Sequence, residues 1–142
     1  KFKRHAHRVT HGRAHGVYIG DYSGCNSLFC PHYNEYGNHL DRPEWQTRDA
    51  EGRPGAFCFG APEFAKYYAR TVADTAREYG FRIHCFDFLG LAPCFATNHG
   101  HPAGRDSLYH QVLGLVHIMT RLNEVDPEMM VWSNSGNWAE FL

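Results

Sequence analysis

The eight residues Phe81-Arg82-Ile83-His84-Cys85-Phe86-Asp87-Phe88 decide the fold, because they form an apolar run that stops at one carboxylate. The run follows directly after the most strongly patterned helical segment of the chain. A buried strand that ends in Asp is how α/β enzymes present an acid at the edge of a parallel sheet. Asp87 is therefore the first candidate for a catalytic residue. The alternative is a turn or N-cap residue whose carboxylate accepts backbone hydrogen bonds.

Residues 62–79 are predicted to form the helix before this strand. Pro62 suits the first helical turn, and Gly80 suits a left-handed cap at the other end. Arg70 and Asp74 lie four residues apart on the solvent face, where they can pair. The opposite face carries a stripe at helical spacing, made of Phe64, Tyr67, Tyr68, Thr71, Val72, Thr75, Ala76 and Tyr79.

Further elements are predicted on both sides of this unit. Residues 16–20 are expected to form a short strand that ends in a turn beginning at Asp21, and residues 128–133 a third strand. From that turn to Gly60 one long polar and aromatic loop is expected, and residues 1–15 are expected to be a poorly defined lead-in. Asp106 is the expected N-cap of a second helix. That helix should bury Tyr109, Val112, Leu113, Val116 and Met119.

Strands that alternate with helices imply right-handed crossovers and a mostly parallel sheet, so the fold class is predicted to be α/β. The loops that begin at Asp21, Asp87 and Ser133 would then meet at one rim of the sheet. Three strands cannot close a barrel. The chain also begins without Met and ends in a segment that looks structured, so residues 1–142 are predicted to be a fragment of one barrel domain.

Composition excludes several kinds of partner. The 14 basic and 15 acidic residues leave a formal charge of -1, which provides no basic field for nucleic acid or anionic lipid. No apolar stretch approaches the roughly 20 residues that a membrane span needs. The five cysteines are odd in number and include no C-x-x-C pair, which favours free thiols.

Several segments together resemble the catalytic barrel of the α-galactosidase (melibiase) superfamily of retaining glycoside hydrolases. The resemblance runs over residues 42 to 138. It lies in Arg42-Pro43-Glu44-Trp45, Phe57-Cys58-Phe59-Gly60-Ala61-Pro62-Glu63, Glu78-Tyr79-Gly80-Phe81, Phe86-Asp87-Phe88, Leu113-Gly114-Leu115, Asp126-Pro127-Glu128 and Trp132-Ser133-Asn134-Ser135-Gly136-Asn137.

This resemblance implies a partial (β/α)8 TIM barrel of about three βα units, completed by the remainder of the parent barrel. It also implies a carbohydrate substrate, with Asp87 as the nucleophile that attacks the anomeric carbon. The acid/base Asp would lie on a later strand, beyond Leu142; Asp21 and Glu140 are the alternatives within the chain. A retaining glycosidase needs these two carboxyl groups about 5 Å apart.

The sequence departs from the family pattern at two places. The family usually has a Lys two residues before the nucleophile, where it binds sugar hydroxyls, and this chain has Cys85. The later strand end is usually richer in Gly and carries an Arg, where this chain has Asn137 and Trp138. Both departures concern the residues that recognise the sugar and leave the nucleophile position in place.

The loops that follow the strands are expected to bind the substrate. Aromatic rings can stack on the apolar face of a sugar, although each Trp, including Trp132, could pack in the core instead. The predicted substrate-binding residues are Asp21, Trp45, His99, His101, Asn134 and Trp138.

Two other functions stay open from the sequence. One is a non-catalytic carbohydrate-binding relative that keeps the pocket without the reaction. The other is a metal-dependent hydrolase in which His99, His101 and Asp87 hold the metal, or in which Cys94 or His110 supplies a further ligand. Because the spacing matches no standard four-ligand pattern, no metal or cofactor is predicted.

Overall fold

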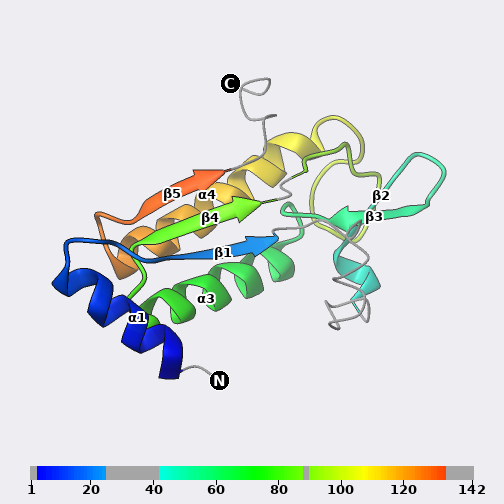
Figure 1. Cartoon of the computed structure of the whole chain (residues 1–142). Coiled ribbons are helices and arrows are strands. Elements are labelled where there is room, and N and C mark those ends of the chain that lie inside the picture. The colour runs from blue at the N-terminus through cyan, green and yellow to red at the C-terminus, as the bar shows by residue number, and fades with distance from the viewer. Residues whose placement is uncertain (1–2, 25–41, 88–89, 134–142) are drawn as a thin grey trace.

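The computed structural model describes residues 3–24, 42–87 and 90–133 (Figure 1). In chain order the elements are α1 (Lys3–Ala14), β1 (Gly20–Gly24), the 3-10 helix η1 (Pro43–Trp45), β2 (Gln46–Arg48), β3 (Pro54–Phe57), α3 (Pro62–Tyr79), β4 (Ile83–Asp87), α4 (Ser107–Val125) and β5 (Met130–Ser133). Within these ranges, no helix is both long enough and apolar enough to cross a membrane.

The central feature is a three-stranded sheet in the order β1-β4-β5, and both strand pairs are parallel. Gly24 pairs with Asp87, and Phe86 with Ser133, so the carboxyl ends of the strands lie at one edge. Helices α3 and α4 pack against each other and run along one side of the sheet (Figure 1). The predicted α/β class and parallel sheet are confirmed.

The core lies between the sheet and these two helices. Phe86 of β4 is fully buried, and its ring lies 6.1 Å from that of Tyr68 on α3. Helix α3 has the predicted bounds, and Gly80 caps it in the left-handed conformation with φ of 71°. The other large buried side chains of this core are those of Phe59, Phe64, Leu115, Ile118 and Leu122.

The buried face of α3 differs in part from the predicted stripe. Ala65, Ala69 and Ala73 are buried, whereas Thr71 is exposed. Small side chains let neighbouring segments approach the helix closely, so alanine occupies positions where an apolar pattern alone would favour larger residues. On the solvent face, Asp74 accepts a hydrogen bond from Arg77 at 3.0 Å, and the predicted pairing of Asp74 with Arg70 is wrong.

Helix α4 buries a different face from the predicted one. Tyr109, Val112, Leu113 and Val116 are exposed, while Ser107, Gln111, Gly114, Leu115, Ile118 and Leu122 are buried. The reason is a close approach at Gly114, where an added Cβ would stand 2.0 Å from the carbonyl oxygen of Phe59. The face of α4 that contains Gly114 is therefore buried, and its more apolar face is exposed to solvent. Asp106 occupies the N-cap position without a side-chain capping bond.

We expect Gly114→Ala to lower the free energy of unfolding by at least about 2 kcal/mol, because relief of the clash requires either α4 or the backbone at Phe59 to shift. Gly90→Ala is the matched control, since a Cβ there would meet no atom of the described residues within 4 Å. That control should change stability by no more than about 0.5 kcal/mol. Urea unfolding of the two variants measures the difference, and equal stabilities would contradict this packing.

Strand β1 lies four residues later than predicted. The segment expected to be a turn, from Asp21 onward, is strand because its backbone pairs with β4 along the whole length of β1. A Cβ at Gly20 would stand 2.7 Å from Cβ of Ile83, so the two backbones are closely spaced there. Residues 3–14, expected to be a lead-in without regular structure, form α1.

The predicted long loop contains a short antiparallel hairpin of β2 and β3. The hairpin is joined to the body of the domain through Trp45, whose ring lies 6.1 Å from Phe57, 5.7 Å from Phe64 and 5.2 Å from Tyr67. The backbone amide of Cys58 also donates to the Trp45 carbonyl at 2.7 Å. These contacts hold the hairpin beside the start of α3.

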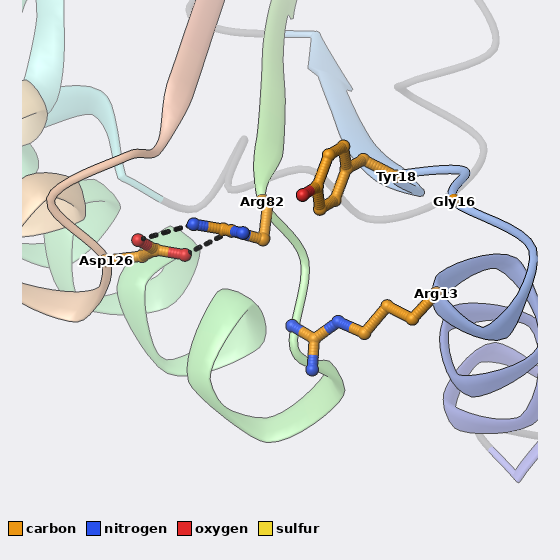
Figure 2. A pocket seen from close by; sticks show the side chains of 5 residues that line it. All are labelled: Arg13, Gly16, Tyr18, Arg82 and Asp126. Carbon is orange, nitrogen blue, oxygen red and sulfur yellow. Dashed lines mark hydrogen bonds and ion pairs between the residues drawn. The ribbon is translucent and has the colours of Figure 1, made fainter.

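The amino ends of the strands are held by an ion-pair cluster around Arg82. Its guanidinium donates to both carboxylate oxygens of Asp126, at 2.6 and 3.3 Å, and lies over the Tyr18 ring (Figure 2). Glu128 adds a second carboxylate. Hydrogen bonds from Arg82 hold the pKa of Asp126 below its usual range. The cluster links β4 to the turn before β5 at the end of the sheet opposite Asp87.

This cluster predicts a pH-dependent contribution to stability. Because the folded-state pKa of Asp126 is lowered, its contribution is complete above the unfolded pKa of about 3.9 and is lost as the pH falls through the folded pKa. Melting temperatures of the wild type and Asp126→Asn should therefore differ at pH 7, and the difference should start to shrink near pH 4 and vanish only below the folded pKa. Asp74→Asn, which removes a solvent-exposed surface pair, should differ little from wild type at either pH. A constant gap for Asp126→Asn would contradict this role.

Candidate active site and a buried Cys/His cluster

The two faces of the sheet have different surroundings. Successive residues of a strand point to opposite sides, so Phe86, which packs on α3, sets the direction of its neighbours. Cys85 and Asp87 therefore point away from the helices. Tyr22 of β1 and Trp132 of β5 are both in register with Cys85 and share this side, where they are 55% and 59% exposed. We call this side the open face.

Asp87 is the last residue of β4, the middle strand, and its side chain is partly exposed. The Tyr22 hydroxyl donates a hydrogen bond to Oδ2 of Asp87. Oδ1 makes no hydrogen bond with any residue in the described ranges. The geometry therefore presents a carboxylate that has one oxygen held and one available, at the edge where the parallel strands end.

Cys85 lies two residues before Asp87 on the open face and is 8% exposed. Burial raises the pKa of its thiol, and the charge of Asp87 adds to this effect. The thiol therefore stays protonated near neutral pH. At this position the chain supplies a small, uncharged group beside the carboxylate.

Asp21 lies on the other side of the sheet from Asp87. It pairs in register with His84, and its Oδ2 stands 3.9 Å from Nδ1 of that histidine. His84 is buried, and burial lowers its pKa, while the charge of Asp21 acts in the opposite direction. Because β1 continues to Gly24, Asp21 does not begin a loop, and the expected rim of Asp21, Asp87 and Ser133 is corrected to Gly24, Asp87 and Ser133.

The structure places the other predicted substrate-binding residues in three settings. Trp45 is 9% exposed and belongs to the aromatic core, which leaves little ring surface for a sugar. His99 and His101 are buried in the loop between β4 and α4. Asn134 and Trp138 lie outside the described residues, as does Glu140.

His99 and His101 lie beside two buried thiols. Their ring nitrogens and the sulfurs of Cys58 and Cys94 all lie within 4.8 Å of one another. Both cysteines are fully buried, and the two histidines are 2% and 8% exposed. We call these four residues the Cys/His cluster. Asp87 and His110, which sequence reasoning offered as possible metal ligands, are not among them.

Backbone contacts of three segments hold the cluster in place. Cys58 follows β3 directly. Cys94 forms an isolated bridge with Gly104, and its amide donates to Oγ of Ser107 at 2.8 Å. The amide of Phe95 donates to the Arg48 carbonyl at 2.7 Å, which joins the loop after β4 to the hairpin.

The two thiols of the cluster lie beside each other. Hydrogen bonding between the two sulfurs lowers the pKa of the Cys94 thiol and raises the pKa of the Cys58 thiol. Backbone amides of Arg48 and Ala96 also favour the Cys94 thiolate. The cluster therefore holds one thiolate readily, as a soft anionic donor.

No protein-family model matches the sequence, and no curated protein matches it. Solved structures match in fold. The α-galactosidase of Thermus thermophilus in complex with stachyose is 20% identical, with a TM-score of 0.57, over 91% of this chain and 27% of its own. The α-galactosidase of Lactobacillus brevis is 13% identical, with a TM-score of 0.60, over 93% of this chain and 18% of its own. The GH36 α-galactosidase of Geobacillus stearothermophilus is 14% identical, with a TM-score of 0.58, over 90% of this chain and 18% of its own.

These comparisons define the class of fold. The chain has the fold of a part of the α-galactosidases, as the sequence resemblance implied. It spans between 18% and 27% of the length of these three structures. The matched structures are those of α-galactosidases, and the similarity concerns the fold.

Sequence reasoning missed Tyr22 and Cys58. Tyr22 would have been found if β1 had been placed correctly, because strand alternation then puts it on the side of Asp87. Cys58 carries a weaker signal, since it stands 36 positions before Cys94 in a segment with no metal-binding spacing. Only the packing of the hairpin against the later loop brings the two thiols together.

Proposed function

We propose that this chain is part of the catalytic barrel of a retaining, α-galactosidase-like glycoside hydrolase, with Asp87 as its nucleophile. The observation that carries the proposal is the position of Asp87 at the carboxyl end of the middle parallel strand, on the open face, with the Tyr22 hydroxyl on one oxygen. In parallel barrels, this end of the strands is where catalytic groups lie.

The chemistry follows from one available carboxylate oxygen. Oδ1 attacks the anomeric carbon while a second carboxyl group protonates the leaving oxygen, and water then releases the sugar from the ester with Asp87. The Tyr22 hydroxyl orients the nucleophile. Asp21 points to the helix side, which disfavours it as the second carboxyl group. We expect that group on a later strand of the barrel.

Exposed apolar side chains on both sides of the sheet support a larger barrel. Met130 and Trp132 on β5 are 62% and 59% exposed, on the side that would face the barrel interior. Val116 and Tyr109 lie on the outer surface of α4. Single exposed apolar residues are common, but two groups of them, on an edge strand and on the helix before it, fit a neighbouring βα unit. The remainder of the barrel would cover both groups.

A sugar site on the open face would draw on residues near the carboxyl end of the strands. Trp132 is well placed to stack on a sugar, because its ring is exposed on the same side as Asp87. Asn134 and Trp138 remain proposed contacts from the segment after β5. Cys85 replaces the usual Lys, so we expect specificity to differ from that of the known α-galactosidases.

The nucleophile is tested with Asp87→Ala in the full-length protein. We expect hydrolysis of the best substrate from a panel of aryl α- and β-glycosides to fall at least about 10³-fold, because no covalent intermediate can form. Asp74→Asn, on the exposed face of α3, is the control and should keep wild-type activity. Circular dichroism should show both variants folded. Retained activity in Asp87→Ala would disprove the assignment.

A second experiment separates a nucleophile from a binding residue. Asp87→Gly leaves room for azide, which should restore turnover and release a glycosyl azide of inverted configuration, because the anion attacks directly from the side of the missing carboxylate. The product is identified by NMR. Sugar binding by the wild type without turnover would instead indicate a carbohydrate-binding protein.

Tyr22→Phe tests the orientation of the nucleophile. A hydrogen bond to a charged group contributes about 1.5 to 3 kcal/mol, so its loss should lower kcat about 10- to 150-fold. KM should change little, since the proposed role of Tyr22 is to orient the nucleophile and not to bind the substrate. Stopped-flow measurement with an activated aryl glycoside shows whether formation of the glycosyl-enzyme is the step that slows. An unchanged kcat would mean that Tyr22 has no part in catalysis.

A further inference from the structure

We propose that the Cys/His cluster of Cys58, Cys94, His99 and His101 binds one Zn²⁺ ion, which joins the β3–α3 connection to the loop after β4. This site is separate from the proposed glycosidase chemistry. It contributes to the stability of two loops at the carboxyl edge of the sheet, and not to bond cleavage.

The first argument is the spacing of the donor atoms. A tetrahedral zinc ion with Zn–S of about 2.3 Å and Zn–N of about 2.0 to 2.1 Å separates its ligand atoms by about 3.3 to 3.8 Å. Sγ of Cys58 lies 3.4 Å from Nε2 of His101, and Sγ of Cys94 lies 3.5 Å from Nδ1 of His99. All four donor atoms fall within 4.8 Å of one another, so small side-chain movements complete the tetrahedron.

The second argument is the orientation of the two imidazoles. Metal-binding histidines usually donate their other ring N–H to a carbonyl or carboxylate, which sets the tautomer. Nε2 of His99 lies 2.8 Å from the Glu44 carbonyl oxygen, so Nδ1 faces the sulfurs. Nδ1 of His101 lies 2.8 Å from the Pro102 carbonyl oxygen, so Nε2 faces them. Each ring thus directs its unprotonated nitrogen to the centre of the cluster.

The third argument is the support of the two sulfurs by backbone amides. Amides of Gly60 and Ala61 approach the Cys58 sulfur, and amides of Arg48 and Ala96 approach the Cys94 sulfur. Backbone N–H donors disperse the negative charge that two thiolates bring to a buried site. A Cβ at Gly60 would stand 2.8 Å from Cδ2 of His101, so glycine is needed for the His101 ring to enter.

The ligand set selects the kind of metal and its role. Two thiolates and two imidazoles form a soft, tetrahedral set that suits Zn²⁺ and excludes Ca²⁺ and Mg²⁺, which prefer oxygen. Four protein ligands leave no position for water or substrate, which is the arrangement of a structural site. All four residues are buried, so solvent has little access to the ion.

The experiment measures zinc in the full-length protein after dialysis against metal-free buffer. Elemental analysis should find one zinc per chain in the wild type and at least a fivefold loss in Cys94→Ser and His99→Ala. Cys85→Ser, which removes another buried thiol outside the cluster, should keep one zinc. Zinc below one fifth of an equivalent in the wild type, or full zinc in both cluster variants, would overturn the proposal.

A measurement on the unmodified protein covers the case in which cluster variants fail to fold. X-ray absorption at the zinc edge should fit two sulfur and two nitrogen neighbours, at about 2.3 and 2.0 to 2.1 Å. Co²⁺ exchanged into the site should show the visible spectrum of tetrahedral thiolate coordination. An all-nitrogen or oxygen shell, or a mass spectrum showing a Cys58–Cys94 disulfide in place of metal, would reject the site.

Discussion

The alternation of side chains along β4 is the constraint on which the rest of the structure depends. This strand is hydrogen-bonded on both sides, and Phe86 must be buried against α3. Its neighbours Cys85 and Asp87 are therefore directed to the open face. A shift of one residue in register would exchange the two sets and place the carboxylate in the core. The apolar packing of one ring thus orients the group proposed to do chemistry.

The carboxyl edge of the sheet combines a candidate active site with a candidate metal site. The loop after β4 connects them, since it begins beyond Asp87 and contains Cys94, His99 and His101. A structural ion in that loop would reduce its freedom beside the nucleophile without taking part in the reaction. Such a division of roles is physically reasonable, because catalytic groups gain from rigid surroundings.

The elements around Asp87 could be predicted because their signals are local. Pro62, Gly80 and the spacing between them define α3 from adjacent residues alone. The buried face of α4 could not be predicted this way: its apolar side is exposed, and Gly114 is buried because the Phe59 carbonyl lies against it. Strand β1 was misplaced for a similar reason, since its polar residues form a strand only by pairing with β4.

The amino-acid sequence by itself determined the α/β class, the helix–strand unit that ends in Asp87, and the resemblance to α-galactosidases. These depend on periodicity and on residue order within short segments. Only the tertiary structure decided that Tyr22 reaches Asp87, that Asp21 faces the helices, and that Cys58 joins Cys94 and the two histidines. The physical reason is that these contacts join segments far apart in the chain, and strand register and loop packing, which no local pattern encodes, bring them together.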